Sequence, residues 1–147
     1  MPEKDTQSLE HELSEAEDFE PFLTENEESL REYSLADYLR KLLAEKHLVQ
    51  AEVIEASGLE PKYADHIFAG RKKHTSRAKA LSIALAMGLT PKEAQYLLYY
   101  AGAERLYVRN PWDSVIWYAL EHHMTVMETN LLLQKVAKQP LLGRVEE

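Results

Sequence analysis

Glycine divides most of this 147-residue chain into short segments with helical spacing. Gly58, Gly70, Gly88 and Gly102 each follow a short run in which apolar residues recur three or four positions apart. Glycine ends helices readily because, without a Cβ atom, it adopts the left-handed backbone conformation at little cost. The spacing of these glycines therefore predicts a series of short helices joined by tight turns.

The starts of these helices are marked as well. Ser34 with Asp37 and Thr90 with Glu93 have the spacing of capping boxes. Prolines 61, 91 and 111 stand at expected first helical positions, where a missing N–H would be unpaired in any case. Together these signals predict helices over residues 34–46, 50–56, 61–69, 76–87, 90–100, 110–123 and 125–138, the last one stopped by Pro140. No segment alternates as a β-strand does, so we expect an all-α protein.

The composition excludes several classes of protein. There is no cysteine, so disulfides, thiolate zinc sites and cysteine nucleophiles are excluded. No apolar run reaches the ~18 residues that a membrane helix needs, and the acidic N-terminus is unlike a signal peptide. We therefore expect a cytoplasmic protein that makes no membrane contact.

The sequence does not indicate an enzyme or a metal protein. It has no paired carboxylates arranged for acid–base chemistry, no glycine-rich phosphate loop and no nucleophile motif. His122 and His123 are neighbours at a predicted helix end and point ~100° apart, so they are not expected to share a metal ion. We expect no catalytic residues, no cofactor and no metal.

Charge is distributed unevenly along the chain. Residues 1–33 contain 12 acidic and two basic residues, whereas residues 34–89 contain nine basic and six acidic ones. We expect residues 1–33 to form an acidic, flexible arm, with a helix beginning near Thr24, where Glu27 completes a possible capping box. Two roles fit this charge: a solubilising arm, or an electrostatic competitor of nucleic acid for the basic body.

The C-terminal third repeats a pattern found earlier in the chain. Residues 84–98 (ALAMGLTPKEAQYLL) and 119–133 (ALEHHMTVMETNLLL) share six of fifteen positions at an offset of 35. Both segments read as a helix end, a short turn, a capping box and a new helix. We interpret residues 103–147 as a linker and an appended helical hairpin, which either packs on the main core or forms a dimer surface.

The region from residue 35 to about residue 100 resembles a known family. Gln50-Ala51-Glu52-Val53, then Gly58-Leu59, and then Ala64, Ile67 and Gly70 resemble the helix-turn-helix domain of the Cro/CI-type (XRE) repressors. The resemblance implies a five-helix domain over residues 34–102, with a recognition helix at 61–69 that enters the major groove. It implies sequence-specific binding of double-stranded DNA in transcriptional regulation, and a possible homodimer.

The same resemblance assigns roles to individual residues. Lys62 and His66 share one face of the recognition helix and occupy positions that reach base edges in the family, where both can donate to guanine O6 or N7. The phosphate-binding candidates are Gln50, Arg71, Lys72, Lys73, Arg77 and Lys79. Phosphate contacts supply affinity and register, and base contacts supply sequence choice.

The chain departs from the family pattern at three positions. Glu60 stands where a small hydroxyl or amide residue is usual, Pro61 replaces a residue that often reads a base, and Asp65 adds a second acid. Because these acids lie where phosphates would approach, an alternative function stays open. In that alternative the fold is a protein-interaction adaptor that binds no DNA and contacts a protein partner through residues 111–138.

Overall fold

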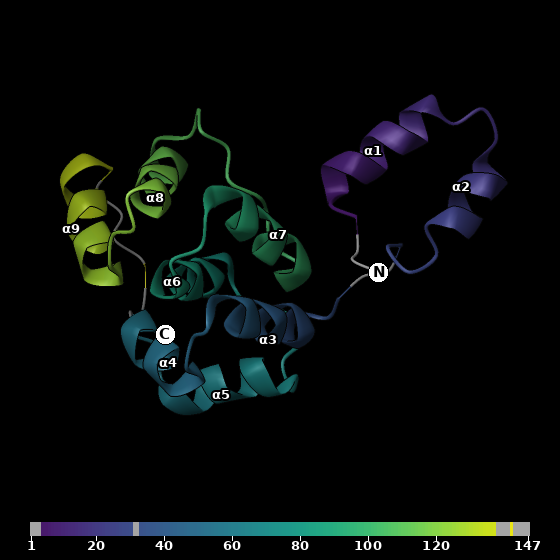
Figure 1. The fold of residues 1–147 in the computed structure, drawn as a ribbon. Helices are drawn as coiled ribbons and strands as arrows, with labels where there is room; N and C mark the ends of the chain where they lie inside the picture. The colour runs from purple at the N-terminus through teal and green to yellow at the C-terminus, as the bar shows by residue number, and fades with distance from the viewer. Residues whose placement is uncertain (1–3, 31–32, 138–141, 143–147) are drawn as a thin grey trace. The chain divides into compact units, whose positions relative to one another are not determined.

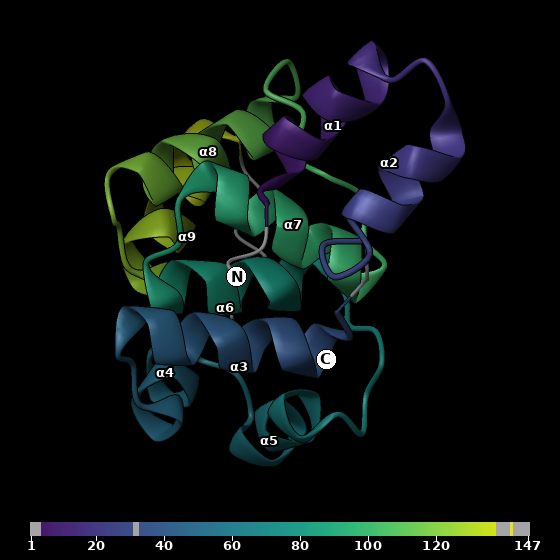
Figure 2. The same ribbon diagram turned by 45° about the vertical axis from the view of Figure 1, so that its right-hand side comes forward.

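The computed structural model describes residues 4–30, 33–137 and 142, and its ribbon is shown in two views in Figures 1 and 2. Within these residues α-helices are the only regular elements, which confirms the predicted all-α class. The helices are α1 (Thr6–Glu15), α2 (Phe19–Glu25), α3 (Leu35–Lys46), α4 (Gln50–Ser57), α5 (Pro61–Ala69), α6 (Arg77–Met87), α7 (Pro91–Ala101), α8 (Pro111–Glu121) and α9 (Val126–Val136). The chain divides into two compact units, Met1–Glu32 and Tyr33–Glu147.

Helix boundaries in the second unit follow the predicted stops and caps within one or two residues. The four glycines at 58, 70, 88 and 102 all have positive φ and end α4 to α7. His47 ends α3 with a φ of 56°, so here a residue with a side chain adopts the same conformation. The last helix ends at Val136 with Ala137 as its C-cap, two residues before the predicted end at 138, and the predicted stop at Pro140 lies outside the described residues.

The acidic arm contains more helix than its sequence indicated. We expected little order in the arm and a helix beginning near Thr24, but α1 and α2 both begin before that point. The Thr24 hydroxyl donates to the Glu20 carbonyl near the end of α2, so the predicted capping box with Glu27 is wrong. Asp5 caps α1 instead, because its carboxylate accepts from the Ser8 N–H at 2.8 Å.

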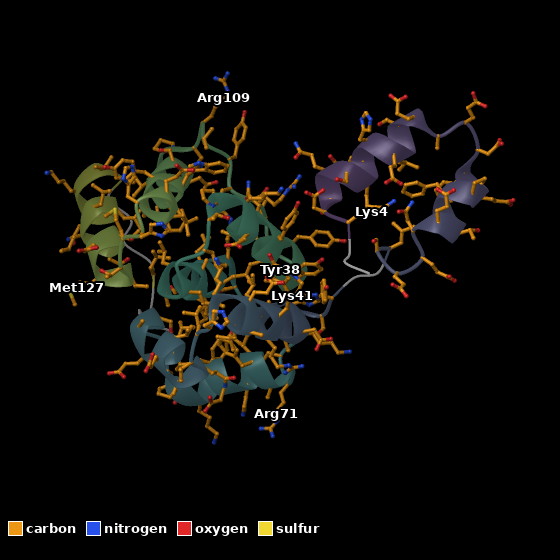
Figure 3. The ribbon with its side chains drawn as sticks, viewed as in Figure 1. Lys4, Tyr38, Lys41, Arg71, Arg109 and Met127 are labelled. Carbon is orange, nitrogen blue, oxygen red and sulfur yellow. The ribbon has the colours of Figure 1, made fainter. Side chains whose placement is uncertain are left out.

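A buried amide holds α1 against α2. The side-chain Nδ2 of Asn26 donates to the Glu12 carboxylate at 3.1 Å and to the Phe22 carbonyl at 3.0 Å. Lys4, labelled in Figure 3, forms an ion pair with the same carboxylate. Hydrogen bonds from Lys4 and Asn26 lower the pKa of Glu12. Because Glu12 and Asn26 are fourteen positions apart, this contact depends on the folded pair of helices rather than on local sequence.

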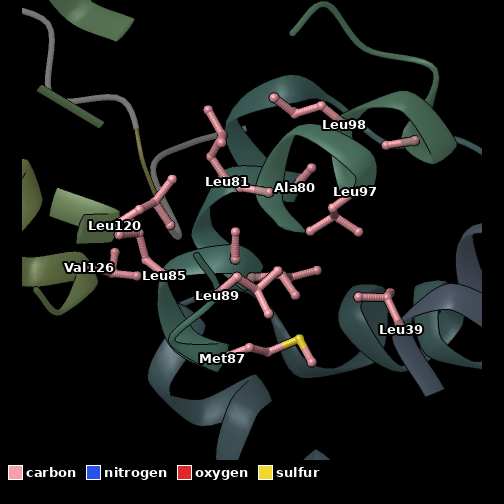
Figure 4. Packing of buried hydrophobic residues seen from close by; sticks show 14 of the residues in the cluster. Leu39, Ala80, Leu81, Leu85, Met87, Leu89, Leu97, Leu98, Leu120 and Val126 are labelled. Carbon is pink, nitrogen blue, oxygen red and sulfur yellow. The ribbon is translucent and has the colours of Figure 1, made fainter. Parts of the chain in front are cut away.

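The core of the second unit surrounds α6. This helix packs against α4, α7, α8 and α9, and α3 packs against α5 and α7. Figure 4 shows Leu81 and Leu85 of α6 near Leu97 and Leu98 of α7 and Leu120 of α8. Burial of one such side chain stabilises the fold by about 1.5–3 kcal/mol. The hairpin of α8 and α9 therefore packs as an added layer on the same core, and its Leu120 and Leu133 belong to the same buried cluster.

No helix in the described part of the chain is long and apolar enough to cross a lipid bilayer.

One ion pair connects the start of α6 to α8. The Arg77 guanidinium binds the Asp113 carboxylate in a bidentate manner, with Nη1–Oδ1 at 3.0 Å and Nη2–Oδ2 at 2.7 Å. Its Nε and Nη2 also donate to the carbonyls of Glu104 and Arg105. Asp113 is 4% exposed and accepts a further bond from the Tyr107 N–H. A pair satisfied in this way holds the loop between α7 and α8 in one geometry.

A second polar contact joins α3 to α7. Lys46 Nζ lies 3.0 Å from Glu93 Oε1, and the Tyr38 hydroxyl donates to the Glu93 carbonyl. Burial, together with the charge of Glu93, raises the pKa of Tyr38 far above its ordinary value. Burial also acts to raise the pKa of Glu93, but hydrogen bonds from Thr90 and Lys46 outweigh it and lower that pKa. The folded state therefore favours the ionised form of Glu93.

Asp113→Ala should lower the free energy of unfolding by about 3 kcal/mol, because it leaves the partly buried Arg77 guanidinium without its charged partner. Chemical denaturation followed by circular dichroism measures this loss. Glu104→Ala is the matched control, since Arg77 contacts only the backbone carbonyl of Glu104, and it should change stability by less than about 0.5 kcal/mol. Equal losses in the two variants would contradict the assigned role of the ion pair.

Glu93→Gln should reduce stability at neutral pH by about 1 kcal/mol and have little effect in acid. The folded pKa of Glu93 lies below its ordinary value of 4.5. Its contribution is therefore present above pH 4.5 and lost as the pH falls through the folded pKa. Denaturation at a series of pH values tests this. Glu128→Gln is the control, because Glu128 caps α9 in the same way but has no ion pair within the described residues.

Candidate functional site

The connection between α4 and α5 is a three-residue turn with a fixed shape. Ser57 is fully buried, and its hydroxyl donates to the Ile54 carbonyl at 2.6 Å and accepts from the Leu59 N–H at 3.1 Å. Gly58 follows with a φ of 75°, a value that favours glycine. Leu59 is buried and anchors the turn in the core. These contacts set the angle at which α5 leaves α4.

α5 is held on the body by its inner face and its last turn. Ala64, Ile67 and Phe68 are buried, and Arg40 of α3 donates to the Phe68 carbonyl at 2.6 Å. In both Figure 1 and Figure 2, α3 lies on one side of α5, and the opposite side of α5 faces outward. The side chains of the outer face are thus presented on a rigidly placed helix.

The outer face carries the two residues that the family resemblance predicts to be base readers. Lys62 is exposed and His66 is half-buried, one helical turn apart. Asp65, also exposed, lies on the same helix. Glu60, which departs from the family pattern, acts as the N-cap of α5, because its carboxylate accepts from the Tyr63 N–H at 2.8 Å. The negative charge of Glu60 therefore caps the first turn of α5.

A basic turn continues from the end of α5. The N–H groups of Arg71 and Lys72 both donate to the His66 carbonyl, and Arg71, Lys72 and Lys73 are exposed. Figure 3 shows Arg71 projecting outward beyond α5. Lys62 and His66 of α5 and the predicted cations 71–73 of the following turn thus form one continuous segment.

An aromatic ring organises part of this segment. Tyr63 of α5 has Lys72 Nζ 5.1 Å and Lys79 Nζ 4.6 Å from its ring centroid. Its hydroxyl forms a 2.6 Å hydrogen bond with the Thr75 hydroxyl. Sequence reasoning did not select Tyr63 or Thr75, because the contacts span the turn between two helices and follow no helical period. The one available signal was an aromatic residue close to a run of basic residues.

Two predicted phosphate-binding residues lie elsewhere. Arg77 uses its guanidinium in four hydrogen bonds, two to Asp113 and two to backbone carbonyls, so it is not available to an anion in this geometry. Gln50 is half-buried at the first position of α4, and no contact within the described residues ties it to the basic turn.

The far end of the basic turn rests on the end of α7. The Thr75 N–H donates to the Ala101 carbonyl. The His74 ring lies so close to Gly102 that a Cβ atom added there would be 2.6 Å from His74 Cδ2. The turn is therefore fixed by α5 on one side and by α7 on the other.

The described part of the chain has no cluster of side chains suited to bind a metal ion. It contains no group of three or more His, Asp or Glu residues that could hold a metal ion. His122 follows α8, and its ring lies 4.1 Å from the Tyr118 ring, centroid to centroid. His123 has a φ of 54° and so lies outside the helix.

Gly102→Ala and Gly88→Ala should each destabilise the chain by about 1 kcal/mol, because both positions have positive φ. Only Gly102→Ala should also move the His74 ring, since nothing lies within 4 Å of a Cβ atom at Gly88. The imidazole resonances of His74 in NMR spectra provide the measurement. If they are unchanged in Gly102→Ala, or shift equally in both variants, the proposed packing of the turn is wrong.

No protein-family model, curated protein or solved structure matches this chain. A function is therefore inferred from the geometry and charge of its own residues.

Proposed function

We propose that this chain binds double-stranded DNA sequence-specifically and regulates transcription, with α5 as its recognition helix. The observation that carries the proposal is the outward face of α5. It bears Lys62 and His66 and continues directly into the exposed cations Arg71, Lys72 and Lys73. A helix presented at the edge of a body, with phosphate-binding groups next to it, suits the major groove.

The proposal includes the finer fold. We assign α3 to α7 to a helix-turn-helix domain of the Cro/CI type, with α4 crossing the DNA backbone above α5. The order of five short helices and the three-residue turn at Gly58 support this assignment. The hairpin of α8 and α9 lies outside that domain and stabilises it through α6 and the pair of Arg77 with Asp113.

In this proposal base choice and affinity come from different residues. Lys62 and His66 donate to acceptors on guanine and supply the base choice. Arg71, Lys72, Lys73 and Lys79 contact phosphates, with Gln50 as a further phosphate contact at the start of α4. Arg77 is left out because its hydrogen bonds are used within the protein.

Fluorescence anisotropy with fragments of the chain's own upstream region, over a range of salt concentrations, tests the proposal. Lys62→Ala and His66→Ala should each relax discrimination at one base position by about 1–3 kcal/mol. Lys72→Ala should weaken binding to all DNA sequences alike. It should also reduce the slope of log affinity against log salt concentration by about one. Arg109→Ala is the matched control, because Figure 3 places Arg109 at the opposite end of the second unit from Arg71.

A lack of binding at low salt would overturn the proposal, since electrostatic attraction to phosphates is strongest there. It would favour the second candidate, a protein-interaction adaptor that uses α8 and α9. Met127 and Leu131 of α9 favour that candidate, because they are 73% and 63% exposed and lie one helical turn apart. A protein partner retained at high salt without nucleic acid, and lost in Met127→Glu, would support it.

A further inference from the structure

Two lysines from different segments both place their ammonium groups near the aromatic ring of Tyr63 in α5. Lys72 lies in the basic turn and Lys79 lies in the first turn of α6, yet both ammonium groups are within 5.1 Å of the Tyr63 ring centroid. Neither lysine forms an ion pair within the described residues. Both positive charges thus border the same aromatic ring, and no ion pair within the described residues neutralises either of them.

The ring that gathers them is itself fixed. The backbone N–H of Tyr63 donates to the Glu60 carboxylate at the start of α5, and the Tyr63 hydroxyl forms a hydrogen bond with the Thr75 hydroxyl beyond the turn. Two ammonium groups repel one another, but the negative face of an aromatic ring attracts each of them. Tyr63 therefore offsets part of the repulsion between Lys72, which is exposed, and Lys79, which is half-buried.

We propose that Tyr63 is the positioning residue of a clamp in which Lys72 and Lys79 together bind one backbone phosphate of DNA. The inference rests on the proposed function. A ring quadrupole does not cancel two full charges, so the clamp keeps an excess of positive charge that attracts an anion. A phosphodiester has two unesterified oxygens, one for each ammonium group. Such a contact fixes register without reading bases.

Salt-dependent DNA binding of Tyr63→Leu and Tyr63→Phe tests the clamp. Leucine removes the aromatic face, so affinity should fall about tenfold, and the slope of log Kd against log salt should become shallower by about one. Phenylalanine keeps the face and loses only the bond to Thr75, so the slope should stay at the wild-type value. If the hydroxyl acted only as a structural tether, Tyr63→Phe would behave like Tyr63→Leu, which would overturn the proposal.

Coupling between variants tests the clamp without relying on the stability of Tyr63→Leu. If Lys72 and Lys79 hold the same phosphate, the double variant Lys72→Ala with Lys79→Ala should lose clearly less affinity than the product of the two single losses. Arg71→Ala is the matched control, because it removes a cation from the same turn that does not contact the ring, and its effect should multiply with that of Lys79→Ala. Multiplicative behaviour of the lysine pair would overturn the clamp.

The outcomes separate the clamp from the proposed function. Wild-type protein that binds DNA while Tyr63→Leu keeps the same affinity and slope would overturn the clamp and leave the proposed function intact. Wild-type protein that fails to bind would overturn both. NMR of the free protein adds a readout that needs no DNA: ring-current shifts of the Lys79 Hε protons should be present in the wild type and in Tyr63→Phe, and absent from Tyr63→Leu.

Discussion

Burial of α6 is the constraint on which the rest of the second unit depends. Seven of its residues are buried, so the other helices must be arranged around it: α4 and α7 against its sides, and α8 and α9 as a further layer. The hydrophobic effect, roughly proportional to the apolar area removed from water, supplies the energy for this arrangement. The polar end of the same helix places Arg77 against Asp113, and this pair determines where the loop after α7 lies.

The candidate site is the part of the fold that the core leaves outside. α5 contributes its apolar side to the body through Ile67 and Phe68, and its polar side remains open. The turn that follows is held at several points, by Thr75 on Tyr63 and by His74 on Gly102. Held cations lose less conformational entropy on binding than mobile ones, so anchoring the turn favours affinity for a phosphate backbone. Rigidity here comes from contacts between segments.

The two units differ in charge and in how they hold together. The first is acidic, and polar contacts of Glu12 in α1 with the buried amide of Asn26 and with Lys4 help to hold it together. The second has a large apolar core and carries its excess of cations around α5. The net charge of −8 for the whole chain conceals this division. Electrostatic attraction to an anionic partner acts through the local surface that faces it, so the cations around α5 matter more than the total.

The sequence by itself determined the helix boundaries of the second unit, because glycine stops and capping residues act within one or two turns of where they stand. It also indicated Lys62 and His66 as neighbours on one helix face, since a period of 3.6 needs no tertiary information. Only the tertiary structure decided that Arg77 forms its ion pair with Asp113, 36 positions away. It likewise decided that Lys72 and Lys79 both contact the Tyr63 ring, and that Asn26 forms a hydrogen bond with Glu12 of α1. Contacts between segments leave no periodic trace in a single sequence, and the folded core alone brings such residues together.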